Sequence, residues 1–524
     1  MVRIKNRFIF IGIILLILLL NVLIRIPLTI SETGTDSFLI HSIAASIYDT
    51  QYIAYSLHPL SMFGYYPYSY ASAVPILLTE FSKISGIELN FVVIAFGILC
   101  SIIGIFSMML LSRLLLDDDL FVIFSVFFYS YSLSYLYWTN YSVATRGFFL
   151  SILPFYIYVF YKLLLEKKTK YLVLSILLLI VLALTHHLFL FVLGYSIIFG
   201  ISYLIYVSQI FTKYVNRISP FITGSIFATI IILITLLPYY LSIFSNISLY
   251  NVSIIKNIFT DLIIYLRAVG FHIILSFICF VWILFKKEKK FIDITLLCSL
   301  IFFAFFIKAT IYIPQVLLLL FSITAAYALI SFISIFKKQT QVKIFFGLVL
   351  IIVSTATLFQ IWHPAIINPR AGIQGRSADL IDIQLGYWVI ENIDGNVINT
   401  DYITQMRLSS MSYCQFIFWG ENAVSCNLIK KTDINITRLS IFNYKSLLDY
   451  PYKVYPSEFE NYIRWVVSAF DISQYRTSKF FYQFNIKALI INNKLPTRNL
   501  KLPSSLTYNN KIYDSGNYEI VYLN

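Results

Sequence analysis

Long uninterrupted apolar runs dominate the first 362 residues of the chain. A run of about 17–25 apolar residues is long enough to cross a bilayer as a helix. Eleven such runs occur, at 8–30, 91–112, 120–138, 148–165, 171–187, 188–207, 221–244, 262–285, 291–307, 310–336 and 344–362. The pattern predicts a polytopic α-helical membrane protein with about 11 transmembrane helices, the first of which is a retained anchor because no small-residue cleavage site follows it.

The segment from Tyr171 to Val207 is 37 residues long, which is too long for a single crossing. Basic residues flank both of its ends, so both ends are expected on the same side of the membrane. The segment is therefore predicted to form a helical hairpin that turns at residues 185–187.

Charge sets the expected orientation. If the N-terminus is cytoplasmic, the short loops on that side hold 17 Lys and Arg residues, and the opposite short loops hold 6. Hydrophobic residues make up 59% of the chain and charged residues only 12%, which excludes a soluble enzyme or a disordered protein. Since most of the net charge of +14 belongs to this topology signal, no nucleic-acid partner is expected.

Two regions are expected outside the lipid on the extracytoplasmic side. Within a transmembrane domain over 1–362, residues 31–90 form a long first outer loop, in which Ser37–Ile47 is predicted to be an amphipathic helix on the membrane surface. Residues 71–84 are predicted to form a second helix of this kind. Mixed charges and the loss of long apolar runs after residue 362 predict a separate α+β domain over 363–524.

Local patterns predict several elements of this C-terminal domain. A helix is expected at Leu380–Asn392, and short strands rich in β-branched residues are expected at 396–401, 488–492 and 518–523. Cys414 and Cys426 lie in the same domain, where they are interpreted either as a disulfide or as two buried thiols.

Asp36 is the first candidate for chemistry. It lies in the sequence GTDS at the start of the predicted surface helix, where an aspartate is favoured as the N-cap residue. A carboxylate at the lipid–water boundary also suits a general base that deprotonates an acceptor hydroxyl. The two interpretations are compatible, because the positive end of a helix stabilises an ionised carboxylate.

Three of the basic residues in the predicted outer loops are further candidates. Arg146 belongs to the loop WTNYSVATRG, and Arg267 and Lys308 follow later in the chain. A guanidinium is suited to hold a lipid-linked phosphate, whereas a basic residue at the end of a span also serves as an interfacial anchor. Both interpretations stay open for all three residues.

Four histidines complete the set of candidates. His186 and His187 lie at the predicted hairpin turn, either as polar cover for the turn or as hydrogen-bond donors to a phosphate or a sugar. His41 is either a lone histidine tolerated on an apolar helix or a site residue, and His58 is assigned to a turn that contains proline. No His or Cys spacing typical of a metal site occurs, so no metal or other cofactor is expected.

The layout resembles the C-type membrane glycosyltransferases, which include protein O-mannosyltransferases, lipid A aminoarabinose transferases and the catalytic subunits of oligosaccharyltransferases. The segments LGYWVIENIDGNVINTD and NIKALIINN, with the closing IYDSGNYEIVYLN, resemble the outer domain of archaeal members. This resemblance implies a catalytic base in the first outer loop and a sugar donor on polyprenyl phosphate, such as dolichyl phosphate, or on the diphosphate. These roles fall on Asp36 as the base, and on Arg146 with Arg267 or Lys308 as the phosphate ligands.

The sequence also departs from this family. Ser37 follows Asp36 where many members have a second acid, and the loop TNYSVATRG lacks the acidic motif through which oligosaccharyltransferases bind a divalent metal. The WWDYG signature is missing, and the nearest strings are GYW at 386–388 and FWGE at 418–421. We therefore expect a metal-independent, inverting enzyme of the hexosyltransferase type that transfers a sugar to a protein or glycan acceptor at the outer face of the cell membrane.

Two alternatives stay open. One is a metal-dependent enzyme similar to the oligosaccharyltransferases. The other is a non-catalytic membrane protein, either a transporter of lipid-linked sugars or an assembly factor of the cell envelope. A transporter is expected to place charges at the midplane of the bilayer, whereas the candidate charges of this chain gather at the predicted outer edge.

Overall fold

The computed structural model describes most of the helical part of the chain and the main sheet of its C-terminal part. The described residues are 7–26, 32–51, 73–140, 142–186, 188–209, 219–245, 254–304, 313–333, 380–399, 402–411, 436–438, 452–454, 485–493 and 511–522. The chain forms two compact units: Met1–Arg25, Ile98–Asn140 and Arg146–Ile366 build unit 1, and Ile26–Gly97, Tyr141–Thr145 and Ile367–Asn524 build unit 2.

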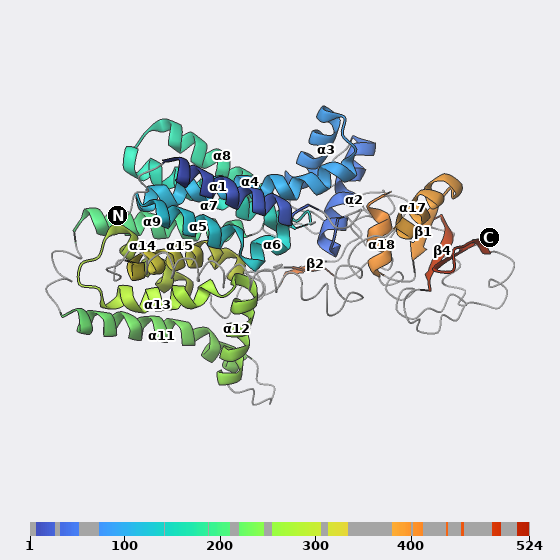
Figure 1. Ribbon diagram of the computed structural model, residues 1–524. Helices are drawn as coiled ribbons and strands as arrows, with labels where there is room; N and C mark the ends of the chain where they lie inside the picture. Colours follow the sequence, from blue (N-terminus) through green and yellow to red (C-terminus); the bar gives the residue numbers. More distant parts are fainter. Residues whose placement is uncertain are drawn as a thin grey trace. The chain divides into compact units, whose positions relative to one another are not determined.

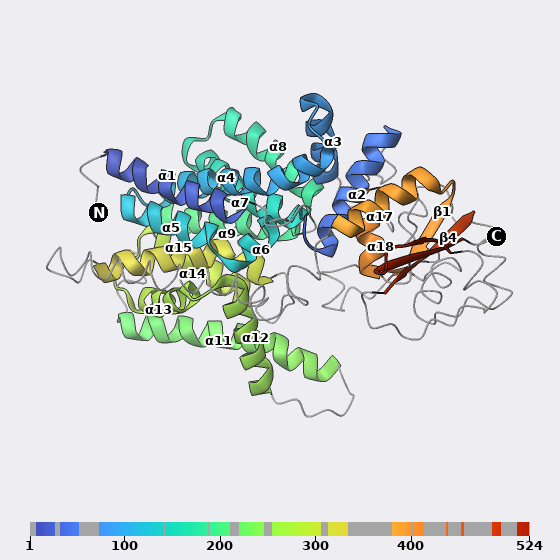
Figure 2. The same ribbon diagram turned by 45° about the vertical axis from the view of Figure 1, so that its right-hand side comes forward.

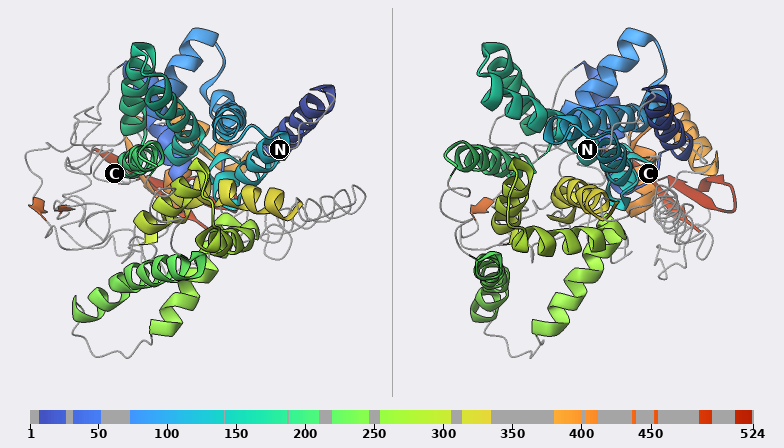
Figure 3. Two further views of the ribbon diagram at one scale, coloured as in Figure 1. Left: turned by 90° about the vertical axis from the view of Figure 1, so that its left-hand side faces the viewer. Right: turned by 60° about the vertical axis from the view of Figure 1, so that its left-hand side comes forward.

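Unit 1 consists of apolar helices. They are α1 (Arg7–Ile24), most of α4 (Leu89–Leu115), α5 (Asp119–Ser130), α6 (Leu133–Thr139), α7 (Thr145–Glu166), α8 (Thr169–Thr185), α9 (Phe189–Val207), α11 (Pro220–Ser245), α12 (Ile254–Val269), α13 (His272–Phe285), α14 (Phe291–Ala304) and α15 (Ile313–Ile333) (Figure 1). α13 packs against α15, which also contacts α5, while α11 lies along α13 and α14 along α9 (Figure 3).

Several of these helices are candidates for crossing a membrane. Among the described residues, α1, α4, α7 and α15 are long and apolar enough, and α5 with α6 adds a fifth if the bent pair is one span. The predicted hairpin is confirmed as two helices, α8 and α9, with the break at the predicted turn. The structure thus shows a mostly helical chain, while the predicted number of about 11 spans and the orientation stay predictions, and the run 344–362 lies outside the described residues.

Two predicted spans are not single straight helices. The run 120–138 is bent by 56° between α5 and α6, because the hydroxyl of Ser132 accepts a hydrogen bond from the backbone N–H of Tyr135 and so starts a new helix. The run 262–285 breaks at Gly270, whose φ of 104° is favourable only for glycine. Each of these two predicted spans therefore consists of two helices.

Buried polar side chains hold α1 to both arms of this bent pair. Asn21 donates to the hydroxyl of Ser130 at the end of α5 over 3.1 Å, and to the carbonyl of Ile17 over 2.9 Å. Arg25, just after α1, donates from Nε and Nη2 to the hydroxyl of Thr139 at the end of α6, over 3.0 and 2.7 Å. Because buried polar groups are costly unless they are hydrogen-bonded, these contacts fix α1 and the bend together.

In unit 2, α2 (Thr35–Thr50) packs against α3 (Ala73–Ser85) and α18 (Tyr402–Ser409). The hydroxyl of Thr79 donates to the carbonyl of Ala44 over 2.9 Å and so links α3 to α2. Nine residues of α2 are buried, on several sides of the helix: Ser37, Phe38, Ile40, His41, Ser42, Ile43, Ala44, Ala45 and Ile47. The prediction of a one-sided helix on a membrane surface is therefore wrong, because protein elements cover α2 on more than one side.

The C-terminal part of unit 2 is a small α+β structure. Its four-stranded sheet has the order β1-β4-β6-β5, formed by β1 (Asn396–Asn399), β4 (Ile486–Asn492), β5 (Lys511–Asp514) and β6 (Tyr518–Tyr522). β1 pairs parallel with β4, and the other two pairings are antiparallel. α17 (Leu380–Asn392) and α18 lie on one face of this sheet (Figure 2).

The predicted helix at 380–392 and the three predicted strands are confirmed, and β2 (Ile436–Arg438) pairs with β3 (Tyr452–Val454) in a second small sheet. The cysteines at 414 and 426 lie outside the described residues, and the domain boundary at 362/363 stays a prediction.

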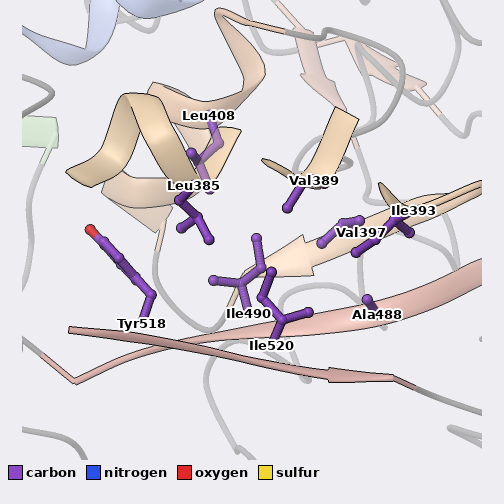
Figure 4. Packing of buried hydrophobic residues seen from close by; sticks show 9 residues of the cluster. All are labelled: Leu385, Val389, Ile393, Val397, Leu408, Ala488, Ile490, Tyr518 and Ile520. Atoms are coloured by element: carbon purple, nitrogen blue, oxygen red, sulfur yellow. The ribbon is translucent and has the colours of Figure 1, made fainter. Parts of the chain in front are cut away.

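The core of this α+β structure lies between the two helices and the sheet. Leu385 and Val389 of α17 and Leu408 of α18 face Ile490 and Ile520 of the strands (Figure 4). All five side chains are fully buried, so each contributes roughly 1.5–3 kcal/mol through the hydrophobic effect. Along β6, Tyr518, Ile520 and Val521 are buried, and Glu519 and Tyr522 are partly buried.

A buried polar network crosses the same core. Asp382 of α17 accepts hydrogen bonds from the guanidinium of Arg407 over 3.2 Å and from the hydroxyl of Tyr518. Nearby, Asn492 of β4 donates to the hydroxyl of Thr404 over 2.8 Å. Burial and the adjacent carboxylate raise the pKa of Tyr518 well above its ordinary value, since both disfavour the phenolate.

Removal of the Tyr518 hydroxyl is expected to lower the stability of unit 2. Tyr518→Phe leaves one oxygen of the buried Asp382 without its donor, which costs about 1–3 kcal/mol of the free energy of unfolding near neutral pH. Because the folded state raises the pKa of Tyr518, its contribution is complete below pH about 10 and is lost as the pH rises further. The variant is therefore expected to lose less stability than the wild type between pH 10 and 11.

Denaturant titrations of the full chain in detergent at several pH values measure both effects. Tyr522→Phe, on the same strand and only partly buried, is the matched control. Equal destabilisation by both substitutions, or an unchanged dependence on alkaline pH in Tyr518→Phe, would contradict the prediction.

Candidate functional site

Arg146 lies in the first turn of α7 and contacts two neighbouring helices of unit 1. The carbon centre of its guanidinium is 4.1 Å from the centroid of a ring of Trp138 on α6, which is a cation–π geometry. Its Nε lies 3.3 Å from Nε2 of His186, at the end of α8. The structure therefore brings together two of the predicted site residues, Arg146 and His186, and adds Trp138, which the sequence did not indicate.

A glycine permits this contact between α6 and α7. A Cβ atom at Gly147 would lie 2.4 Å from the carbonyl oxygen of Trp138, closer than real Cβ atoms approach other atoms. The start of α7 can therefore pack directly against the end of α6 only because residue 147 has no side chain. This close approach places the neighbouring Arg146 over the indole of Trp138.

His186 is held in the short turn between α8 and α9. Its backbone N–H donates to the carbonyl of Leu182 over 3.2 Å, which ends α8. Its Nδ1 accepts from the backbone N–H of Leu188 over 3.1 Å, and the ring packs near Phe149. The residue is 4% exposed, so the turn positions the ring inside the protein.

N–H groups point at both ring nitrogens of His186. An uncharged imidazole has one lone pair, and the two donors are the backbone amide of Leu188 and the guanidinium of Arg146. Neither donor loses its proton, so the two contacts compete for that lone pair. Nε of Arg146 donates to Nε2 of His186 over 3.3 Å. A guanidinium, which carries five N–H donors, suits an oxyanion.

The other predicted basic residues are not placed. His187, Lys308 and His58 lie outside the described residues, and Arg267 belongs to α12 by its backbone, with a side chain that is likewise outside them. Their assignment to the site stays a prediction.

Asp36 belongs to unit 2, where it lies half-buried in the first turn of α2. The N-cap is Gly34, whose carbonyl accepts from the backbone N–H groups of Ser37 and Phe38 over 3.1 and 3.2 Å. The N-cap interpretation of Asp36 was therefore wrong, because the helix begins one residue before it. A carboxylate in the first turn still lies at the positive end of the helix dipole.

The residue next to Asp36 ties α2 to the segment that precedes α7. The hydroxyl of Ser37 accepts from the backbone N–H of Val143 over 2.9 Å. Residues 141–145 belong to unit 2 together with α2, and Arg146 follows them directly in the chain. The segment that leads to Arg146 is thus anchored beside Asp36 within unit 2.

A buried acid–histidine pair lies near the same helix start. Nδ1 of His41 is 2.7 Å from a carboxylate oxygen of Glu32, and each residue is only 3% exposed. His41 is therefore paired, and is not a lone histidine on an apolar helix. Glu32 was missed in the sequence, where the only signal was an acid four residues before Asp36. When Nδ1 donates to Glu32, an uncharged His41 carries its lone pair on Nε2.

In the described part of the chain, no three His, Cys, Asp or Glu side chains lie close enough together to hold a metal ion. Metal independence stays a prediction, since part of the chain is not covered. A narrow, largely apolar cavity in unit 1 is lined by residues that include Tyr195, Phe199, Thr295 and Ser299, and none of the candidate residues borders it.

Comparisons with known proteins give a match at the level of structure. No protein-family model matches the chain, and no curated protein matches its sequence. The structure is similar to that of the archaeal oligosaccharyltransferase AglB from Archaeoglobus fulgidus, which was solved in complex with an inhibitory peptide and a dolichol-phosphate. The match covers 93% of this chain and 69% of that one, with a TM-score of 0.53 and 10% sequence identity. The chain shares the fold of this oligosaccharyltransferase.

The apo form of the Archaeoglobus fulgidus oligosaccharyltransferase is a second match, with a TM-score of 0.46 and 11% identity over 92% of this chain and 69% of that one. The family resemblance is confirmed for the fold. At such low identity the roles of individual residues do not follow from it.

The hydrogen bond from Leu188 to His186 makes a prediction about substitutions of this histidine. In His186→Asn, the side-chain oxygen can take the place of Nδ1 and accept from Leu188, so the stability is expected to stay close to that of the wild type. His186→Ala removes this acceptor and is expected to lower the free energy of unfolding by about 0.5–1.5 kcal/mol. Thermal unfolding in detergent measures the difference, and a loss of similar size in both variants would contradict the role of Nδ1 as the acceptor.

Proposed function

We propose that the protein is a membrane glycosyltransferase that uses a sugar donor linked to polyprenyl phosphate. The observation that carries the proposal is the guanidinium of Arg146, which is stacked on Trp138 and hydrogen-bonded to His186, in a chain with the fold of an oligosaccharyltransferase. A guanidinium matches the oxygens of a phosphate group. The enzyme acts at the outer face of the cell membrane, with residues 363–524 extracytoplasmic, and transfers a hexose.

The phosphate is the leaving group of the reaction. As the bond between the anomeric carbon and the phosphate oxygen breaks, negative charge grows on that oxygen. Arg146, with His186 beside it, stabilises this charge more strongly than it stabilises the intact donor, which lowers the barrier. The stacking on Trp138 and the contact with His186, which is itself held by backbone bonds, fix the guanidinium beforehand.

Asp36 supplies the base in this proposal. It takes the proton of the acceptor hydroxyl while the oxygen attacks the anomeric carbon from the side opposite the phosphate. One carbon–oxygen bond forms and one breaks, the bonding electrons leave with the lipid phosphate, and the configuration at the anomeric carbon is inverted. The bond between Ser37 and Val143 supports this role, because it anchors the segment before Arg146 next to Asp36.

The C-terminal part of unit 2 contributes to acceptor binding. α18 packs on α2, the helix that carries Asp36, so the α+β structure contacts the element that bears the proposed base. Asp382 is not a suitable position at which to test acceptor binding. It is fully buried in the core network, and its loss would unfold the unit. The acceptor is a protein or a glycan with a free hydroxyl.

Asp36→Asn is expected to lower sugar transfer by about 10²-fold or more, because the amide keeps the shape of the side chain and removes its basicity. Transfer from polyprenyl-phosphate-linked radioactive hexoses to endogenous acceptors in membranes measures the effect. Glu88→Gln, an exposed acid before α4, is the control and is expected to leave the rate unchanged. Full activity of Asp36→Asn would refute its role as the base.

Transfer is also expected to persist in the presence of a chelator. The described part of the chain offers the guanidinium of Arg146 as a donor for the phosphate, and the loop 139–147 has no acid that would ligate an ion. Purified enzyme assayed with and without EDTA tests this expectation. Activity that disappears in EDTA and returns with Mn²⁺ or Mg²⁺ would contradict it, and would favour an enzyme of the metal-dependent oligosaccharyltransferase kind.

A further inference from the structure

Arg25 is a buried cation, and its hydrogen-bond acceptors among the described residues are all neutral. It is 1% exposed. Its Nη1 donates to the backbone and side-chain oxygens of Asn21 over 3.0 and 2.9 Å, and its Nε and Nη2 donate to the hydroxyl of Thr139. The guanidinium also lies 5.5 Å from the centroid of the Tyr135 ring. These contacts satisfy most of its N–H groups but bring no negative charge.

A buried charge without a counter-charge is unusual. Arginine is almost never fully buried unless it is paired, because the loss of hydration costs several kcal/mol per ion. A guanidinium cannot escape this cost by losing its proton at any physiological pH. Neutral dipoles compensate part of the cost, but the positive charge remains, and its field is weakly screened in a medium of low dielectric constant.

The position of Arg25 connects it to the proposed phosphate site. Thr139, which accepts from Arg25, follows directly after Trp138, over which Arg146 is stacked. The end of α6 therefore carries two guanidiniums, one from the end of α1 and one from the first turn of α7. Both residues belong to unit 1, and their charges have the same sign, so an anion bound there would relieve their repulsion.

We propose that Arg25 is the second positive charge of the Arg146 site and raises its affinity for the phosphate group of the lipid-linked donor. The inference rests on the proposed function and deepens it. Arg146 contacts the phosphate, whereas Arg25 acts through its electric field, because its N–H groups are largely used by Asn21 and Thr139. Arg25 is therefore a positioning residue for the anion and takes no part in bond making.

Arg25 also links α1 to α6, and suitable variants separate this mechanical role from the electrostatic one. Arg25→Lys keeps the charge, but a single ammonium cannot reproduce the fork that joins Asn21 to Thr139. Arg25→Gln removes the charge and keeps hydrogen-bonding capacity. Thr139→Val removes the main acceptor of Arg25 while the charge stays.

Binding of farnesyl phosphate to the full-length protein in detergent is the test, measured by calorimetry at two salt concentrations. Farnesol, which has the same chain without the phosphate, is the matched ligand. Arg25→Gln is expected to raise the Kd for farnesyl phosphate about 10-fold and to reduce its salt dependence. Arg25→Lys and Thr139→Val are expected to stay within about threefold of the wild type, and no variant should change farnesol binding.

Asn21→Asp keeps the experiment decisive if Arg25→Gln does not fold. The new carboxylate would replace the amide oxygen that lies 2.9 Å from Nη1 and would neutralise the charge of Arg25 in place. It is expected to weaken farnesyl phosphate binding to a similar extent. Three results would overturn the inference. The first is wild-type affinity for farnesyl phosphate in both Asn21→Asp and Arg25→Gln. The others are an equal loss of this affinity in Arg25→Lys, or a parallel loss of farnesol binding.

Arg146→Gln distinguishes this inference from the proposed function. If Arg146→Gln binds farnesyl phosphate as tightly as the wild type, the phosphate site itself is wrong. If Arg146→Gln loses affinity and Arg25→Gln does not, the phosphate site stands and only the role of Arg25 is refuted. If Arg146→Gln and Arg25→Gln both lose affinity for farnesyl phosphate while Arg25→Lys stays close to the wild type, both proposals are supported.

Discussion

The arrangement of unit 1 depends on the requirement that polar groups buried among apolar helices find partners inside the protein. The helix after Asp119 bends at Ser132, and the bend is held from outside by Asn21 and Arg25. Their side chains reach one residue at the end of each arm, Ser130 and Thr139. Without them, a bend at this depth would leave polar groups exposed to apolar surroundings, at a cost of several kcal/mol each.

The geometry of the candidate site follows from this bend. The orientation of α6 determines where Trp138 lies, the missing side chain at Gly147 lets α7 approach it, and Arg146 stacks on the indole as a result. His186 reaches the same guanidinium from a turn that is closed by backbone bonds. A site assembled from helix ends in this way is rigid, because Arg146 and His186 are each held by a group that cannot easily move.

Local patterns in the sequence predicted the elements that depend on local forces. The break between α8 and α9 followed from the length of the apolar segment and its basic flanks, and the helix at 380–392 followed from the local pattern of residues. Strands β1, β4 and β6 were recognisable from their β-branched residues, whereas β5 was not predicted. The bends at Ser132 and Gly270 were not, because a single serine or glycine in an apolar run is common in straight helices. The burial of α2 was missed for another reason, since the covering helix α18 lies about 350 residues later in the chain.

In the candidate site, too, some residues could be predicted from the sequence and others could not. Asp36, Arg146 and His186 could be selected because ionisable residues are rare in apolar sequence, and the structure brings two of them into contact. The pairing of Glu32 with His41 and the neutral partners of Arg25 could not be predicted, because they depend on which side chains meet in three dimensions.

The division of unit 2 among distant segments has a consequence for biosynthesis. α2 and α3 leave the ribosome early, but α18, which completes the cover of α2, is made only after about 350 further residues. At about 5–20 residues per second, this delay lasts roughly 20–70 s. During that time the side of α2 that packs on α18 has no partner from its own chain, so a nascent chain stalled before residue 402 would be a natural substrate for chaperones and for quality-control proteases.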